Sequence, residues 1–185
     1  VMIEIMGENL NEMPSRIKGA ALSCILSDTL GFRSPTTTDL DRSTAQKLAE
    51  DLKIDVQYFA SELFKAKSDV SKYTDPELIL MDSKKYDVGG KKLRISVMET
   101  TQPQEILGRK KSLLKAMKDI EAEEGVDQIL FFVIDILKQE AILFVPNKLV
   151  KEIAEKSFGT SCVEDTTILP GILSRKKQII PQLKV

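Results

Sequence analysis

Hydrophobic residues in the first third of the chain follow a helical period. The first eight residues read as part of a helix that began earlier, and Pro14 marks the first turn of the next helix. That second helix carries apolar residues at three- and four-residue intervals with extra leucines between them, so we expect it to be buried on nearly all sides up to Asp28. Two more helices are expected, one capped by Thr38 or Asp39 and one over residues 56–65. We interpret the aromatic residues of the last helix as core: Tyr58, Phe59 and Phe64.

A polar stretch without any period, residues 67–74, follows this helical region. Asp75-Pro76-Glu77 then opens another helix, because acidic residues favour the first turn of a helix. A polar, aperiodic stretch between two hydrophobic patterns is typical of a domain boundary. We therefore predict a first domain over residues 1–66, a linker over 67–74 that acts as a hinge, and a second domain over 75–185.

The second domain combines strand and helix patterns. Gly89-Gly90 predicts a two-residue hairpin turn, and the alternation over residues 93–98 predicts a half-buried strand. One long amphipathic helix is expected over residues 105–124, because its apolar residues share a face. The unbroken apolar run over residues 129–134 is suited to a central strand that is covered on both faces.

The remaining pattern predicts two more strands, over residues 141–145 and 166–169. Between them lies a helix that Asn147 caps and Gly159 ends. Asp135, at the end of the central strand, is interpreted as a turn residue, with a role in a site as the alternative. Strands and helices in this order predict an α/β protein, in which a mixed sheet with helices packed on it follows the helical region.

The amino-acid composition excludes several classes of partner and of metal site. With 42% hydrophobic and 30% charged residues the chain is typical of a globular protein, and its net charge of −1 argues against a nucleic-acid partner. We expect no membrane partner, since no apolar run reaches about 18 residues, and we see no signal peptide. Cys24 and Cys162 fit no metal-ligand spacing, so we expect two buried thiols in a reduced, cytoplasmic protein. The chain has no histidine and cannot build a histidine-containing metal site alone.

The most distinctive chemistry lies near the C-terminus, where Arg175-Lys176-Lys177 stands between apolar runs and no acidic residue follows Thr166. Flanking apolar runs tend to be buried, so the cations between them are expected to be anchored. A fixed guanidinium beside a fixed ammonium suits a phosphate group, because arginine supplies a planar fork and lysine a compact charge. On composition alone, the alternative is a solvated basic turn.

The sequence of this stretch, Ser-Arg-Lys-Lys-Gln-Ile-Ile-Pro-Gln-Leu over residues 174–183, closely resembles the C-terminal signature of the family II inorganic pyrophosphatases, the manganese-dependent members of the DHH phosphoesterase superfamily. Residues 22–36 are similar to the final metal-binding motif of that family's N-terminal DHH domain. The resemblance covers essentially all 185 residues. It implies that residues 1–66 are the C-terminal part of a DHH domain and residues 75–185 a whole DHHA2-type domain, which binds substrate.

The resemblance assigns roles to four residues. Asp28 would ligate one of two divalent metal ions; from the residues alone, a local cap or turn contact is the alternative. Lys84, in an Asp-x-Lys unit, would bind substrate together with Arg175 and Lys176, and no catalytic residue is assigned. The implied substrate is pyrophosphate, and the implied cofactor is two manganese ions, with cobalt or magnesium as alternatives.

The family's other metal ligands, paired histidines and several aspartates, would precede Val1. We therefore expect the full-length protein to hydrolyse pyrophosphate with a water activated by two metal ions, and this chain alone to be inactive. The resemblance is compatible with a homodimer. Two alternatives remain open: a non-catalytic regulatory module that binds phosphate or nucleotides, and a related phosphoesterase that acts on polyphosphate or nucleotides.

Overall fold

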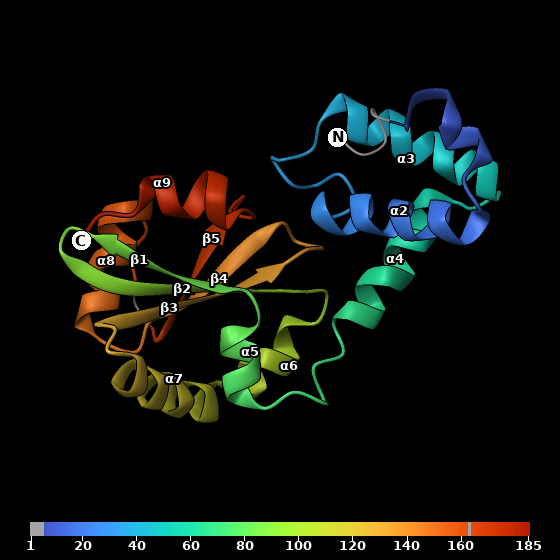
Figure 1. Ribbon diagram of the computed structural model, residues 1–185. Coiled ribbons are helices and arrows are strands. Elements are labelled where there is room, and N and C mark those ends of the chain that lie inside the picture. The colour runs from blue at the N-terminus through green and yellow to red at the C-terminus, as the bar shows by residue number, and fades with distance from the viewer. Residues whose placement is uncertain (1–5, 163) are drawn as a thin grey trace. The chain divides into compact units, whose positions relative to one another are not determined.

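The chain divides into two compact units, Val1–Ala66 and Lys67–Val185 (Figure 1). The structure, a computed structural model, describes residues 6–162 and 164–185. Most of the helix expected over residues 1–8 lies outside the described residues; from Gly7 to Glu12 the backbone forms a 3-10 helix, η1. The predicted bounds of the domains and of the linker stay a prediction.

The first unit is helical. After η1 come α2 (Ser15–Asp28), α3 (Asp39–Leu52) and α4 (Val56–Lys67). Thr38 caps α3 as expected: its hydroxyl accepts a hydrogen bond from the backbone N–H of Asp41, whose carboxylate accepts one in return from the backbone N–H of Thr38. This reciprocal capping box satisfies donors that a helix start would otherwise leave unpaired.

Two expectations about burial in the first unit are wrong. The helix α2 buries only Lys18, Leu22 and Leu26 among the described residues, because α3 packs against one of its faces, and Ile17 is 46% exposed. Of the aromatic residues in α4, Phe64 is buried, whereas Tyr58 is 68% exposed. A helical apolar period thus found the helices, but it did not show which of their faces are covered.

The second unit is built on a mixed five-stranded sheet in the order β1-β2-β3-β4-β5, which confirms the predicted α/β class. The pair β2–β3 is parallel and the other pairs are antiparallel. The strands are β1 (Ser83–Val88), β2 (Lys91–Thr100), β3 (Gln128–Asp135), β4 (Glu140–Phe144) and β5 (Thr166–Pro170). The helices are α5 (Asp75–Met81), α6 (Pro103–Gly108), α7 (Lys110–Glu124), α8 (Lys148–Phe158), the π-helix η2 (Arg175–Ile179) and α9 (Ile180–Gln182).

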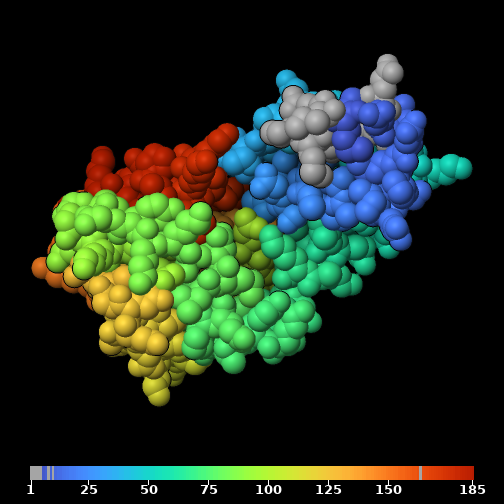
Figure 2. All heavy atoms as spheres, viewed as in Figure 1, coloured from blue at the N-terminus to red at the C-terminus, as the bar shows by residue number. Residues whose placement is uncertain are grey.

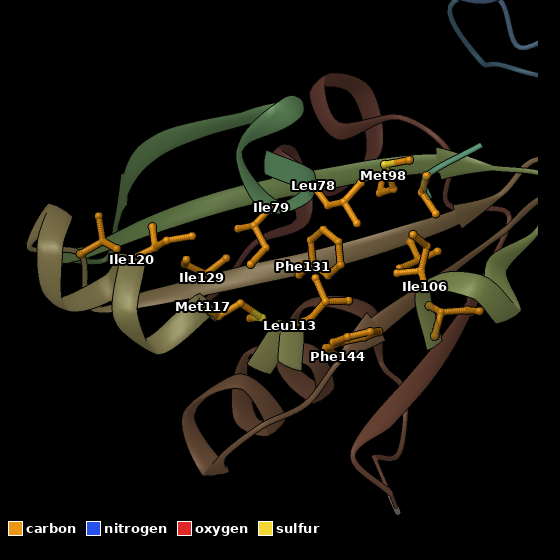
Figure 3. Close-up of a cluster of buried hydrophobic side chains, with 14 residues drawn as sticks. Leu78, Ile79, Met98, Ile106, Leu113, Met117, Ile120, Ile129, Phe131 and Phe144 are labelled. Carbon is orange, nitrogen blue, oxygen red and sulfur yellow. The ribbon is translucent and has the colours of Figure 1, made fainter. Parts of the chain in front are cut away.

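Helices cover both faces of this sheet (Figure 1). On one face, α5, α6 and α7 bury a hydrophobic cluster that includes Phe131 and Phe144, whose rings meet edge to face at 5.4 Å (Figure 3). On the other face, the ring of Phe132 meets that of Phe158 in α8 at 6.1 Å. The central strand β3 is buried along its whole length, as predicted from its apolar run.

Two details of the second unit differ from expectation. The strand β2 is not half-buried, since all of residues 93–98 are buried, because its parallel pairing with β3 places it inside a sheet covered on both faces. The helix expected over residues 105–124 is two helices that meet at Arg109. The guanidinium of Arg109 donates hydrogen bonds to Asp75 Oδ1 (2.8 Å) and to the backbone oxygens of Val70 (3.3 Å) and Tyr73 (2.9 Å). These contacts also hold the polar stretch 67–74, which belongs to the second unit, against the rest of that unit.

Candidate functional site

The three basic residues Arg175-Lys176-Lys177 lie on a turn, which hydrogen bonds among adjacent residues of the sequence hold in place. The side-chain oxygen of Gln178 accepts hydrogen bonds from the backbone N–H groups of Leu173 (2.9 Å) and Ser174 (3.0 Å), and its amide nitrogen donates to the backbone oxygen of Gly171 (2.7 Å). Leu173 and Ile179 are buried, as expected of the apolar flanks. The backbone between them forms the π-helix η2. Such helices are rare in proteins, and those that occur are often found at functional sites.

Arg175 joins this turn to the start of β1. Its Nη1 donates to the backbone oxygen of Asp82 (2.9 Å), and its Nη2 lies 2.8 Å from Asp82 Oδ1. The side chain of Arg175 is only 14% exposed, so the guanidinium is held between the two segments. Figure 2 shows the C-terminal segment (red) lying along the β1–β2 hairpin (green) at the surface of the second unit.

Lys84 follows Asp82 by two residues and is exposed on β1. Its neighbours Ser83 and Lys85 face α7, since Ser83 Oγ accepts from Arg94 Nη1 and Lys85 Nζ lies 3.1 Å from Glu124 Oε2. Side chains alternate along a strand, so Lys84 faces the opposite side of the sheet, which the C-terminal segment covers. Lys84 and Arg175 therefore belong to the same face of the second unit.

Lys176 is exposed on η2, next to Arg175 in the sequence. The structure thus places the segments that carry the three cations at one edge of the sheet. The Arg175 side chain is largely shielded and paired with Asp82, whereas Lys84 and Lys176 face solvent. A doubly charged phosphate group could accept hydrogen bonds from such a set, because lysine ammonium groups are mobile point charges and the arginine fork is already oriented.

Asp28 is the last residue of α2, as predicted. Asp28 is exposed, whereas the helix was expected to be buried on nearly all sides up to this residue. The hydroxyl of Thr36 lies 3.5 Å from its backbone oxygen, and no described residue is recorded as a partner of its carboxylate. Asp28 belongs to the first unit, whereas Lys84, Arg175 and Lys176 belong to the second.

A manganese ion in a protein usually takes several oxygen or nitrogen ligands. The chain has no histidine, and within residues 6–162 and 164–185 no three cysteine, aspartate or glutamate side chains gather to hold a metal ion. The described residues by themselves therefore do not fit a manganese site. Asp28 could contribute at most one side chain to such a site.

Asp135 is a turn residue, as we interpreted it from the sequence. It is 3% exposed, and its Oδ1 accepts hydrogen bonds from the backbone N–H groups of Leu137 and Lys138, both at 3.0 Å.

The prediction of two buried thiols is half wrong: Cys162 is buried, and its burial raises the pKa of its thiol, but Cys24 is exposed on α2. Cys24 is exposed because only one face of α2 is covered, and α3 packs against that face.

Sequence reasoning missed the role of Asp82. The Asp-x-Lys unit was interpreted through its lysine, although the aspartate of the same unit is the residue that binds Arg175. The available signal was an acidic residue close to a proposed anion site, where a negative charge is unexpected. Its partner lies 93 positions away in the sequence, so a single sequence did not reveal the pair.

The family described as the DHHA2 domain matches residues 61–185. The chain belongs to this family. It is 38% identical over 183 residues to the manganese-dependent inorganic pyrophosphatase of Methanocaldococcus jannaschii and 34% identical over 184 residues to that of Bacillus subtilis. These alignments cover 98% and 99% of this chain but 59% of each relative, so the chain spans well under two thirds of their length.

A solved structure supports the same relationship. The chain matches a crystal structure from Methanococcus jannaschii, assigned to the family II inorganic pyrophosphatases, with a TM-score of 0.80 and 38% identity. The match covers 92% of this chain and 55% of that one. It confirms the mixed α/β fold and the family resemblance seen in the sequence. Within the part of the chain that the structure describes, no helix is long and apolar enough to cross a membrane.

Proposed function

We propose that a protein containing this chain hydrolyses inorganic pyrophosphate to two phosphates. In this proposal Lys84, Arg175 and Lys176 bind the phosphate groups of the substrate. The supporting observation is the bond between Arg175 and residue 82, which ties the basic turn to the strand that carries Lys84. The names of the relatives, manganese-dependent inorganic pyrophosphatases, give the substrate.

The proposed cations suit this reaction. Pyrophosphate is small and highly charged, and phosphoryl transfer depends mainly on positioning and on neutralising charge around the phosphorus that is attacked. Arginine can hold two phosphate oxygens in a fixed geometry, and two lysines can follow the charge as the bridging bond breaks. Because η2 is braced by Gln178 and Arg175 is largely buried, the basic turn is ordered before substrate arrives.

The metal belongs to the same proposal. The names of the relatives imply manganese, and we propose two ions, with most ligands from parts of a longer protein and Asp28 as one contribution. The same longer protein could form a homodimer, and the stretch 67–74 could act as a hinge that brings the two domains together. This chain alone would bind pyrophosphate without hydrolysing it, because the residues that the structure describes include no ligand set that fits the metal.

Calorimetric titration of this chain with pyrophosphate tests the binding step. We expect Lys176→Ala to weaken binding by about ten- to a hundredfold, since a charge-assisted hydrogen bond is worth roughly 1.5–3 kcal/mol. Lys184→Ala, which removes an exposed cation from the last residues of the chain, is the matched control and should change the affinity little. Equal losses in the two variants would show that only overall charge matters.

Hydrolysis is tested with the longer protein and manganese, measuring phosphate released from pyrophosphate, polyphosphate and nucleotides. Preferred turnover of pyrophosphate supports the proposal. Binding without turnover of any of these substrates by the longer protein would favour a regulatory phosphate-binding module. Turnover by this chain alone would contradict the proposed division of labour.

A further inference from the structure

We propose that Asp82 is a built-in counter-ion of Arg175, and that a phosphate group reaches Arg175 by displacing the Asp82 carboxylate. The inference rests on the proposed function, because it concerns the same cations. The inference adds Asp82 to the proposed site, although hydrolysis of pyrophosphate does not itself require an acidic residue beside the cations that bind the anion. It therefore makes a prediction that the proposed function alone does not make.

The two contacts between Arg175 and Asp82 differ in character. The backbone oxygen of Asp82 also accepts a hydrogen bond from the backbone N–H of Val97 (2.9 Å), so this acceptor is fixed by the sheet. Within the described residues, the contact with Arg175 is the one that holds the carboxylate, and the side chain of Asp82 is 56% exposed. Breaking the carboxylate contact would leave Arg175 anchored through the backbone, while the carboxylate turned into water.

Arg175 needs an anion in the absence of substrate. Its side chain is 14% exposed, and a charge that is removed from water is costly unless it is paired. Among the described residues, Asp82 is the only recorded acceptor for its guanidinium. An arginine has five N–H donors, so donors remain for an incoming phosphate even while the backbone contact is kept.

The position of Asp82 makes it a competitor of substrate. It precedes Lys84 by two residues, so a negative charge lies beside the cations that would bind phosphate. A singly charged anion gains little by replacing a carboxylate that is already in place. A phosphate group with two negative charges, held by Lys84 and Lys176 as well, gains more than the carboxylate loses. Asp82 would therefore raise the selectivity of the site for highly charged phosphates.

Calorimetric titration of this 185-residue chain with pyrophosphate, at low ionic strength, tests the inference. Asp82→Asn keeps the size of the side chain and removes its charge. We expect it to bind pyrophosphate about two- to fivefold more tightly, which is the scale of one exposed ion pair. Acetate should gain at least as much, because the neutral amide competes less with weak anions.

Asp87→Asn is the matched control. Like Asp82, which immediately precedes β1, Asp87 is an exposed acid; it lies on β1, where alternation places it on the face opposite to Lys84. The same loss of charge there should change the affinity less than the Asp82 substitution does. The double variant Asp82→Asn, Arg175→Ala should show no gain over Arg175→Ala, because the competition needs the guanidinium. Circular dichroism and thermal unfolding confirm that each variant is folded.

Unchanged or weaker pyrophosphate binding by Asp82→Asn would overturn the inference, since Asp82 would then position Arg175 rather than compete with substrate. A gain that persists without Arg175, or an equal gain in Asp87→Asn, would overturn it as well, as would the absence of binding in all variants. The proposed function fails separately: a longer protein that does not hydrolyse pyrophosphate would contradict it, even if Asp82→Asn binds the anion more tightly.

Discussion

Glu121 in α7 and Gln128 at the start of β3 are joined by a hydrogen bond of 2.7 Å from Gln128 Nε2 to Glu121 Oε1. The same oxygen accepts from the backbone N–H of Ile129 (2.7 Å), and Gln128 Oε1 accepts from Asn147 Nδ2 (2.6 Å). Asn147 in turn caps α8. A short chain of polar side chains thus connects α7, the central strand and α8, with Gln128 only 3% exposed.

Glu121→Gln should make the second unit more stable at neutral pH. Burial raises the pKa of Glu121, although the hydrogen bond from Ile129 and the charge of Lys118 act in the opposite direction. Because the pKa of Glu121 is higher in the folded state, its protonated form favours folding. This contribution to the free energy of unfolding is fully present below the ordinary pKa of 4.5, and it is lost as the pH rises through the raised pKa of the folded state. Glutamine keeps the acceptor oxygen without the charge, so its advantage should grow from pH 4 to pH 7.

Urea unfolding at several pH values measures this effect. Glu123→Gln removes the same charge from an exposed position of the same helix and serves as the control. A difference between Glu121→Gln and the unsubstituted protein that is the same at pH 4 and pH 7 would contradict the prediction.

Glu124→Gln, in contrast, should make the second unit less stable at neutral pH. The carboxylate of Glu124 accepts hydrogen bonds from Nε (2.9 Å) and Nη2 of Arg94, and Lys85 Nζ lies 3.1 Å away. The bond from Arg94, helped by Lys85, holds the pKa of Glu124 below its ordinary value. This stabilisation is present above pH 4.5 and is lost as the pH falls through the lowered pKa. We expect a loss of about 1–2 kcal/mol at pH 7 that fades under acid conditions.

Chemical unfolding at pH 7 and pH 3 checks this expectation, with Lys85→Ala as the comparison. Lys85 is 51% exposed in its side chain, so its removal should cost less than about 0.5 kcal/mol. A larger loss for Lys85→Ala than for Glu124→Gln would show that Arg94 is not the main partner.

Phe131→Ala should be among the most damaging substitutions in the second unit. Phe131 is fully buried on β3 in the cluster that α5 and α7 cover, and its ring packs against Phe144 (Figure 3). Truncation of a buried phenylalanine costs about 3–5 kcal/mol. Ile168→Ala, at a position that is 53% exposed on the outer strand β5, should cost less than about 1 kcal/mol. Denaturation midpoints compare the two, and similar losses would argue against the described core.

The two capping threonines test whether the units are separate folding domains. Thr38 caps α3 in the first unit, and Thr74 caps α5 in the second. Each Thr→Ala change should cost about 1 kcal/mol. If the units unfold separately, hydrogen exchange should accelerate in the first unit alone for Thr38→Ala and in the second unit alone for Thr74→Ala. Faster exchange throughout the chain in either variant would contradict separate domains.

Local features of the fold were predictable because they depend on neighbours in the sequence. Thr38, Asn147 and Gly159 mark helix ends through backbone geometry that each residue type favours, and all three do so in the structure. The run 129–134 was long and apolar enough to require cover on both faces. The split at Arg109 was not predictable, because the acceptors that hold its guanidinium lie in the segment 70–75, far away in the sequence.

By itself, the sequence determined the α/β class, most element positions, the membership of the DHHA2 domain family and a candidate set of phosphate-binding cations. Only the tertiary structure decided which faces of α2 and β2 are covered and that Arg175 is paired with Asp82. The physical reason is range. Periodicity and capping are set within a few residues, whereas burial and ion pairing depend on which distant segments the fold brings together.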